Sequence, residues 1–202
     1  MIISHSKQFI FLKSPKTAST STERLFQTVC DGDDIIGWRG PPPMPEGTEY
    51  YNHMKLKHLK TKVSEDNWNT YYKFGNVRNP WDRVVSSYFF RKDVLSKNPH
   101  NPTDWQDGES FEQFVLTRKL PGKLSVFFDG FTEMDFLIRF ENIEEDIQTV
   151  SDTLNLNLNI DLLPHTHEGV REKDYKPYYN TETKDFVAQY YAEEIAYLGY
   201  TF

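Results

Sequence analysis

Two short segments of the chain combine cationic and hydroxyl side chains in a way that suits an anionic ligand. The first is residues 15–21, Pro-Lys-Thr-Ala-Ser-Thr-Ser, in which Lys16 precedes a cluster of hydroxyl groups. The second contains Arg78 and Ser86. A lysine supplies a full positive charge, hydroxyl groups supply short-range donors, and a guanidinium can hold a phosphate through two parallel hydrogen bonds. Both segments are therefore predicted to bind anions.

A strand and a helix are expected to position the first segment. Residues 8–12 (Gln-Phe-Ile-Phe-Leu) form an apolar run typical of a buried strand, and residues 19–29 show helical spacing after hydroxyl residues suited to capping. At such a strand-to-helix junction in a parallel sheet, backbone N–H groups and the positive end of the helix favour phosphate or sulfate. The alternative is a hydroxyl-rich helix cap beside a solvated lysine, and this segment alone does not separate the two.

The second segment has the same surroundings. A strand is predicted over residues 71–77, and a helix follows from about Pro80 to Arg91, with proline at an allowed first-turn position. Ser86 lies about two turns into this helix, so that Arg78 and Ser86 can reach one anion. The alternative is that Arg78 forms a structural salt bridge and that Ser86 is a packing residue.

The remaining pattern predicts the fold class. A third strand is expected at residues 136–138, a helix at residues 141–154, and further helical segments at residues 181–197. Strands that alternate with helices predict an α/β fold, with a central parallel sheet flanked by helices in three layers. A chain of 202 residues is expected to form a single domain, residues 1–202.

Composition excludes several classes of partner. A net charge of −7 argues against bulk binding to nucleic acid or to an anionic membrane. The only cysteine is Cys30, so no intrachain disulfide can form. The sequence has no 18-residue apolar run and no signal-peptide pattern. We therefore expect a soluble cytoplasmic protein with no nucleic-acid or membrane partner, and its oligomeric state is left open.

A nucleotide-dependent kinase is the main alternative enzyme class. Its P-loop has two glycines separated by four residues, and the second glycine is followed by a lysine and then a serine or threonine. No glycine lies between Met1 and Cys30, which counts against a kinase. A catalytically silent protein that binds nucleotide or carbohydrate is the second alternative, because a fold alone does not establish activity.

Both segments resemble one enzyme family. Residues 11–21 (Phe-Leu-Lys-Ser-Pro-Lys-Thr-Ala-Ser-Thr-Ser) are similar to the phosphosulfate-binding loop of sulfotransferases that use 3′-phosphoadenosine-5′-phosphosulfate (PAPS). The carbohydrate branch typically has Pro-Lys-Thr-Ala-Gly-Thr-Ser, so Ser19 replaces a glycine, and this change is expected either to tighten the loop or to remove a left-handed backbone conformation. Residues 74–88 resemble the segment that binds the 3′-phosphate of PAPS. The resemblance spans nearly the whole chain and implies the P-loop-like sulfotransferase fold.

The resemblance implies a donor and the residues that bind it. PAPS is the expected co-substrate and PAP, the 3′,5′-bisphosphate, the expected product, with no metal required. Lys16 is the expected catalytic cation. The residues expected to bind the nucleotide are Lys16, Thr17, Ala18, Ser19, Thr20, Ser21, Arg78, Ser86 and Arg171. His165 and His167 are close in sequence, but no accompanying cysteine or carboxylate pattern indicates a zinc site.

The acceptor must lose a proton, and a histidine is the natural base. The pair His58-Leu59 resembles a segment that carries a catalytic histidine in some carbohydrate sulfotransferases, so His58 is the expected base. His53 is the alternative, and Glu49 is a further candidate. The family branch implies a carbohydrate hydroxyl as acceptor, and residues 37–47 and 93–130 are the segments expected to select it.

Overall fold

The computed structural model describes residues 1–40, 43–95, 108–117, 119–164 and 171–202. These residues belong to two compact units. The sheet unit comprises residues 1–77 and 124–166, and the helical unit comprises residues 78–123 and 167–202. The expected single domain over residues 1–202 stays a prediction.

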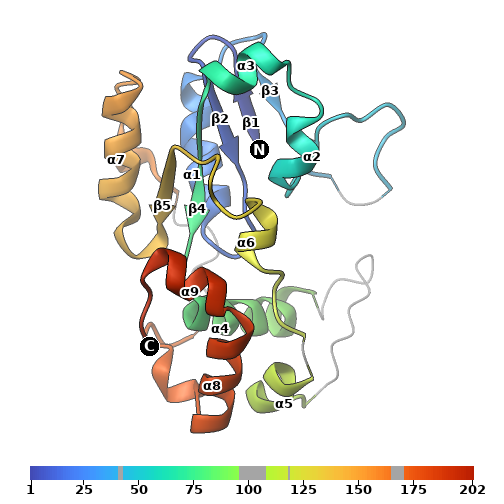
Figure 1. The fold of residues 1–202 in the computed structure, drawn as a ribbon, viewed down its shortest axis with the longest axis vertical. Helices are drawn as coiled ribbons and strands as arrows, with labels where there is room; N and C mark the ends of the chain where they lie inside the picture. The colour runs from blue at the N-terminus through green and yellow to red at the C-terminus, as the bar shows by residue number, and fades with distance from the viewer. Residues whose placement is uncertain (41–42, 96–107, 118, 165–170) are drawn as a thin grey trace. The chain divides into compact units, whose positions relative to one another are not determined.

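A mixed sheet forms the centre of the sheet unit (Figure 1). Its strands are β1 (Ile2–Ser4), β2 (Phe9–Leu12), β3 (Ile35–Ile36), β4 (Tyr72–Val77) and β5 (Phe136–Arg139). In the described part of the chain the strand order is β3-β1-β2-β4-β5. Strands β2, β4 and β5 are parallel neighbours, with Phe11 opposite Phe74 and Phe74 opposite Phe136. Strand β1 is antiparallel to both β2 and β3.

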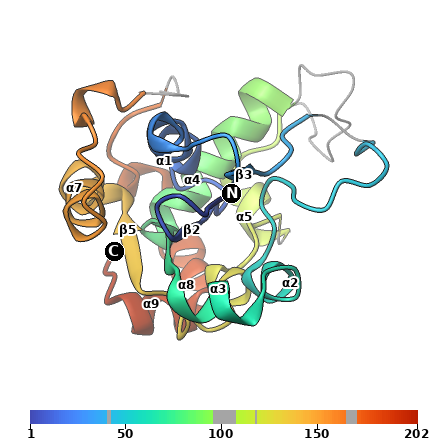
Figure 2. The ribbon, with the colours of Figure 1, turned by 90° about the horizontal axis from the view of Figure 1, so that it is seen from above.

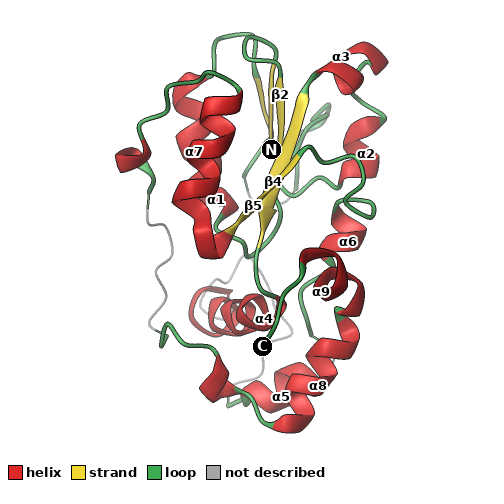
Figure 3. Cartoon of the chain, turned by 60° about the vertical axis from the view of Figure 1, so that its left-hand side comes forward, coloured by secondary structure: helices red, strands yellow, loops and turns green. Residues whose placement is uncertain are grey.

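Helices cover both faces of this sheet. They are α1 (Ser19–Phe26), α2 (Leu56–Lys60), α3 (Glu65–Thr70), α6 (Leu124–Phe127) and α7 (Ile143–Thr153). Figure 2 shows α1 and α7 on one face and α2 and α3 on the other, and Figure 3 shows α6 on the same side as α2 and α3. The predicted α/β class, with helices on both sides of a sheet, is confirmed. Its parallel part is β2, β4 and β5, and the antiparallel strands β1 and β3 are additions that the sequence pattern did not show.

Aromatic side chains fill the core between the sheet and α1. Phe9 and Phe11 are two residues apart in β2, so their side chains lie on the same face of the sheet. There they pack against Phe26 and Phe74, and all four side chains are fully buried. The rings of Phe26 and Phe74 are 4.8 Å apart. Burying each such ring contributes about 1.5–3 kcal/mol to folding. This packing fixes α1, and with it the loop that precedes α1, against the sheet.

Gly75 lets β4 pass close to its neighbours. A Cβ atom at this position would lie 2.7 Å from the Phe128 ring and 2.8 Å from the Leu12 carbonyl oxygen. Both distances are shorter than any ordinary carbon contact, so a side chain here would push β4 away from β2 and from Phe128. Glycine therefore keeps the carboxyl ends of β2 and β4 in register.

The helical unit is built around α4 (Pro80–Phe90), which continues into a π-helical turn at Arg91–Leu95. Its other helices are α5 (Phe111–Leu116), α8 (Thr181–Tyr190) and α9 (Ala192–Leu198). Helices α4, α5 and α8 pack on one another through a core that includes Trp81, Val84, Phe114 and Val187.

Local signals start α4, α5 and α8. Asn79 caps α4 by accepting a hydrogen bond from the Trp81 N–H, and Pro80 occupies the first helical position. Capping boxes begin α5 at Ser110 and α8 at Asn180. None of the helices in the described ranges is both long and apolar enough to cross a membrane.

Candidate active site

The Lys16 loop, defined here as residues 13–18, joins the end of β2 to the start of α1. Lys16 and Ala18 both have a left-handed backbone, with φ of 64° and 58°. Ala18 is the N-cap residue of α1, and its own side chain makes no capping hydrogen bond. Because the first N–H groups of a helix lack intrahelical partners, such a start with its positive dipole end favours an anion.

Buried hydroxyl groups hold this loop in place. The Ser14 hydroxyl donates to the backbone carbonyl of Asn76 in β4 and lies 2.8 Å from the Thr17 hydroxyl oxygen. The Asn76 amide donates in turn to the Thr22 hydroxyl in α1, at 2.9 Å. The loop is thus tied to both β4 and α1. Ser14 and Asn76 were not among the predicted site residues, although both stand in the motif segments.

Ser19 stands where similar loops have glycine, and the structure shows the effect of this change on the backbone. It is the first residue of α1, and the left-handed conformation belongs to Ala18, one position earlier. The Ser19 hydroxyl donates to the Ser14 carbonyl, a bond that glycine could not make. The substitution therefore removes no left-handed residue and adds a contact across the loop.

A buried carboxylate joins the beginning of the loop to α1. Glu23 is fully buried, and its oxygens lie 2.7 Å from Lys13 Nζ, 3.1 Å from an Arg39 nitrogen and 2.6 Å from the Met1 amino group. Burial alone would raise the pKa of Glu23, but the amino group and Lys13 outweigh this effect and hold it below its usual value. The ionised Glu23 therefore anchors the first residue of the loop.

His53 contacts the Lys16 loop directly. Its ring Nδ1 lies 2.9 Å from the backbone carbonyl oxygen of Lys13. Because a carbonyl only accepts hydrogen bonds, Nδ1 carries the proton and Nε2 keeps its lone pair. The residue is exposed, but the protein atoms around the ring partly desolvate it and lower the pKa of His53 below the ordinary 6.5. His53 is therefore neutral at pH 7 and can accept a proton at Nε2.

His58 has different surroundings. It lies in the short helix α2, it is exposed like His53, and its Nδ1 is 2.8 Å from the Tyr51 hydroxyl. Of the two histidines expected near the site, the structure places His53 rather than His58 in hydrogen-bonding contact with the Lys16 loop. The sequence could not show this, because the contact spans 40 residues.

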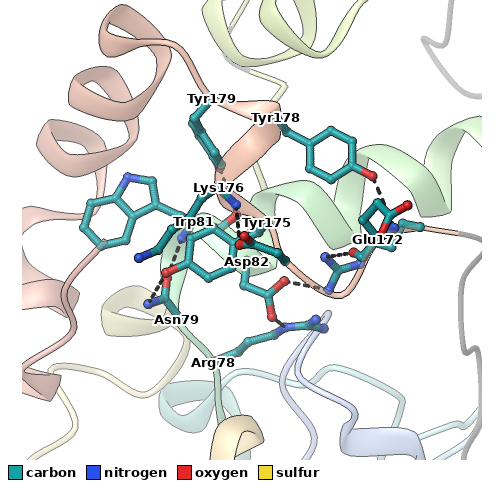
Figure 4. A network of polar contacts seen from close by, with 11 residues as sticks. Arg78, Asn79, Trp81, Asp82, Glu172, Tyr175, Lys176, Tyr178 and Tyr179 are labelled. Atoms are coloured by element: carbon teal, nitrogen blue, oxygen red, sulfur yellow. Dashed lines mark hydrogen bonds and ion pairs between the residues drawn. The ribbon is translucent and has the colours of Figure 1, made fainter.

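The second anion segment is organised by a carboxylate (Figure 4). Arg78 Nε donates to Asp82 Oδ2 at 2.7 Å, and Arg171 Nη2 donates to Asp82 Oδ1 at 2.6 Å. All three side chains are largely buried, with 6%, 9% and 13% of their surface exposed for Arg78, Asp82 and Arg171. Ser86 lies four residues after Asp82 and so on the same face of α4. We call these four residues the Asp82 cluster.

Further hydrogen bonds dock the chain after Arg171 onto the start of α4 (Figure 4). The Tyr179 hydroxyl donates to the Trp81 carbonyl at 2.8 Å, and the Asn79 amide lies 3.3 Å from the Tyr175 hydroxyl. Burial raises the pKa of Tyr179, so its hydroxyl stays protonated and donates. Arg171 therefore belongs to a segment that is fixed to α4 at several points.

Comparison with known proteins identifies the family. A model of the sulfotransferase family matches residues 1–200. The chain belongs to the sulfotransferase family. No curated protein matches it. A solved structure with a similar fold is mouse sulfotransferase SULT7A1 complexed with PAP, which is 16% identical, with a TM-score of 0.60 over 96% of this chain and 86% of that chain. At this identity the likeness concerns the fold, and it confirms the predicted sulfotransferase fold.

The predicted residues of this sulfotransferase divide between the two units. The sheet unit carries Lys16, Thr17, Ala18, Ser19, Thr20, Ser21, His53 and His58, and the helical unit carries Arg78, Ser86 and Arg171. The Lys16 loop follows the last residue of β2, and Arg78 follows the last residue of β4, its parallel neighbour. In open α/β sheets, ligands bind beyond the carboxyl ends of such strands.

Some predicted positions of the sulfotransferase lie outside the described residues. They are His165 and His167, Pro41 and Pro42 of the expected acceptor loop, and residues 96–107 and 118 of the second segment expected to select the acceptor.

Proposed function

We propose that this sulfotransferase takes the sulfuryl group from PAPS and transfers it to a hydroxyl group of a carbohydrate. The observation that carries the proposal is that Arg78, predicted to bind the 3′-phosphate, and Arg171, predicted to bind the nucleotide, share the Asp82 carboxylate. The Lys16 loop supplies a second set of anion-binding groups for the phosphosulfate end. The PAP complex of the mouse sulfotransferase supports this choice of nucleotide.

The donor groups present fit the two charged ends of PAPS. In the proposed arrangement, Lys16 and residues 17–21 hold the phosphosulfate end, with the start of α1 contributing backbone N–H groups. Arg78, Ser86 and Arg171 hold the 3′-phosphate. The two arginines and Asp82 together carry one net positive charge, which suits a phosphate. When bound, PAPS supplies the activated sulfuryl group.

Lys16 is the proposed catalytic cation. Sulfuryl transfer, like phosphoryl transfer, demands in-line positioning and stabilisation of negative charge on the leaving oxygen. Lys16 holds its charge at the start of the helix that faces this oxygen in the proposal. A fixed cation of this kind needs no rearrangement during the reaction, so its full effect is available in the transition state.

His53 is the proposed general base, in preference to His58. Its Nδ1 proton is held by the Lys13 carbonyl, so Nε2 carries the lone pair that would accept a proton. The lowered pKa of His53 keeps it unprotonated at neutral pH. His58 and Glu49 are the alternatives. The carbohydrate class of acceptor rests on the similarity of residues 11–21 to that branch of the family.

Calorimetric titration tests the donor. The protein should bind PAP without metal and bind ATP with Mg²⁺ more weakly, because PAP carries phosphates at both the 3′ and 5′ positions. Tighter binding of ATP with Mg²⁺ would support a kinase and contradict the proposal.

A transfer assay tests the acceptor. Labelled PAPS is incubated with the protein and a panel of sugars, glycolipids, phenols and amines. Label should appear on sugar hydroxyls. Label on phenols or amines alone would contradict the acceptor class while keeping the donor. No transfer to any acceptor by a protein that binds PAP would indicate a silent binding protein.

A further inference from the structure

Two arginines from distant parts of the helical unit share one carboxylate. Arg78 precedes α4, Asp82 lies in the first turn of α4, and Arg171 comes 89 residues after Asp82. Each carboxylate oxygen accepts from a different guanidinium, at 2.7 Å and 2.6 Å (Figure 4). Two guanidinium groups this close repel each other, so an intervening negative charge is needed to hold them side by side.

Asp82 is itself firmly placed. It follows the Asn79 cap and Pro80 at the start of α4, where the helix dipole favours a carboxylate. The Arg78 contact is made through Nε, whose N–H lies in the guanidinium plane, so the bond constrains the direction of the guanidinium. The carboxylate therefore sets the orientation of Arg78 relative to Arg171.

We infer that Asp82 is a positioning residue that presents Arg78 and Arg171 as a pair to the 3′-phosphate of the nucleotide. The inference rests on the proposed function, since it concerns the same nucleotide. Asp82 itself repels a phosphate, so by charge alone it weakens binding. Its benefit is that both guanidinium groups are ordered before the nucleotide arrives, which removes an entropic cost from binding.

The other contacts of the Arg171 segment make this inference testable. Tyr179 and Tyr175 hold the segment on the start of α4 without using Asp82. Removing the charge of Asp82 should therefore leave Arg171 near its position, but the Arg171 guanidinium would no longer be held in one orientation. A purely structural ion pair would instead stabilise the fold and affect every ligand alike.

The experiment compares PAP with adenosine 5′-monophosphate, which lacks the 3′-phosphate, by calorimetry on the parent protein and on Asp82→Asn. The parent should bind PAP more tightly. In Asp82→Asn the ratio of PAP affinity to monophosphate affinity should fall about tenfold or more, because charge-assisted hydrogen bonds to the 3′-phosphate are lost. Monophosphate affinity should change less than about twofold. Asp185→Asn is the matched control, since it removes an exposed carboxylate of α8 and should leave the ratio unchanged.

Each outcome decides the inference. An unchanged or increased ratio in Asp82→Asn, or an equal loss for both nucleotides, would overturn it. A parent protein that binds both nucleotides equally would overturn it as well, while a parent that does not bind PAP would refute the proposed function instead. If Asp82→Asn does not fold, Arg171→Lys takes its place, because lysine keeps the charge but lacks the planar fork. An unchanged ratio in Arg171→Lys would overturn the inference.

Discussion

Ser19 shows how a single residue changes the construction of an anion-binding loop. Its hydroxyl bonds to the Ser14 carbonyl, while the left-handed turn of the loop is made by Ala18. The residue that typically supplies flexibility in similar loops is thus replaced by one that supplies a hydrogen bond. The loop should accordingly be more rigid with serine than with glycine at this position.

Paired glycine substitutions test this account. Ser19→Gly should lower the free energy of unfolding by about 1–2 kcal/mol, because it loses a buried hydrogen bond and places glycine in a helix. Ala18→Gly should leave it unchanged or raise it by up to about 1 kcal/mol, because φ is already positive there. Urea denaturation measures both values. Equal losses at the two positions would contradict the assigned backbone conformations.

The pH dependence of turnover tests His53. Partial desolvation of the ring lowers the pKa of His53, so its neutral, basic form is present above that pKa and is lost only as the pH falls below the ordinary histidine range. We expect kcat/KM to stay level from pH 8 to about pH 6.5 and to decline only at lower pH.

Two variants separate the candidate bases. His53→Gln should reduce kcat/KM by about 10²–10⁴ and remove the acidic decline. His58→Gln should keep both the rate and the decline. The reverse pattern would assign the base to His58.

At the scale of elements, α4 is held to α9 by a buried ion pair. Arg83 is fully buried, its Nη2 lies 3.2 Å from a Glu194 carboxylate oxygen, and its guanidinium stacks 4.9 Å from the Tyr191 ring centre. Across the residues that the structure describes, Arg83 Nε and Nη1 have no hydrogen-bond partner. Glu194 is therefore the main compensation for this buried charge.

Replacing only Glu194 should destabilise the fold more than replacing both Arg83 and Glu194. Glu194→Leu should lower the free energy of unfolding by about 3–5 kcal/mol, because it leaves Arg83 charged and buried. Arg83→Met combined with Glu194→Leu should recover part of this loss, because no buried charge remains. Denaturant melts of the two variants provide the measurement. A double variant less stable than Glu194→Leu would contradict this view of the pair.

Elements with strong periodicity or clear end signals were predictable from the sequence. The predicted strands at residues 8–12, 71–77 and 136–138 correspond to β2, β4 and β5, and the helix expected from Pro80 is α4. Strand β1 and helix α2 were not predicted, because elements of three and five residues are too short to show a period.

The site was predictable only where one segment contains all its parts. The Lys16 loop lies between one strand and one helix, so its place followed from local signals. The role of Asp82 did not, because an aspartate in the first turn of a helix is ordinary and its partner Arg171 is distant in sequence. The contact of His53 with Lys13 was not predictable either, because the two residues are 40 positions apart in the sequence.

At the scale of the whole molecule, an acidic protein of net charge −7 has its proposed nucleotide-binding cations in three short stretches, around Lys16, Arg78 and Arg171. Bound nucleotide should stabilise the folded chain, because it binds the folded state and not the unfolded state. PAP at 100 times its Kd should raise the free energy of unfolding by about 2.7 kcal/mol and the melting temperature by about 5–10 °C. Thermal unfolding with PAP, and with ATP and Mg²⁺ for comparison, measures this effect. An equal or larger shift with ATP would contradict the donor assignment.

The central claim is that Lys16 promotes sulfuryl transfer from PAPS, and transfer of label from PAPS by the parent protein and by Lys16→Ala tests it most directly. With an acceptor that the parent protein labels, we predict that Lys16→Ala folds and binds PAP but transfers label about 10²–10³ times more slowly, as when a preorganised charge contact to a leaving oxygen is lost. A Lys16→Ala protein that binds PAP and transfers label at the parent rate would contradict the claim.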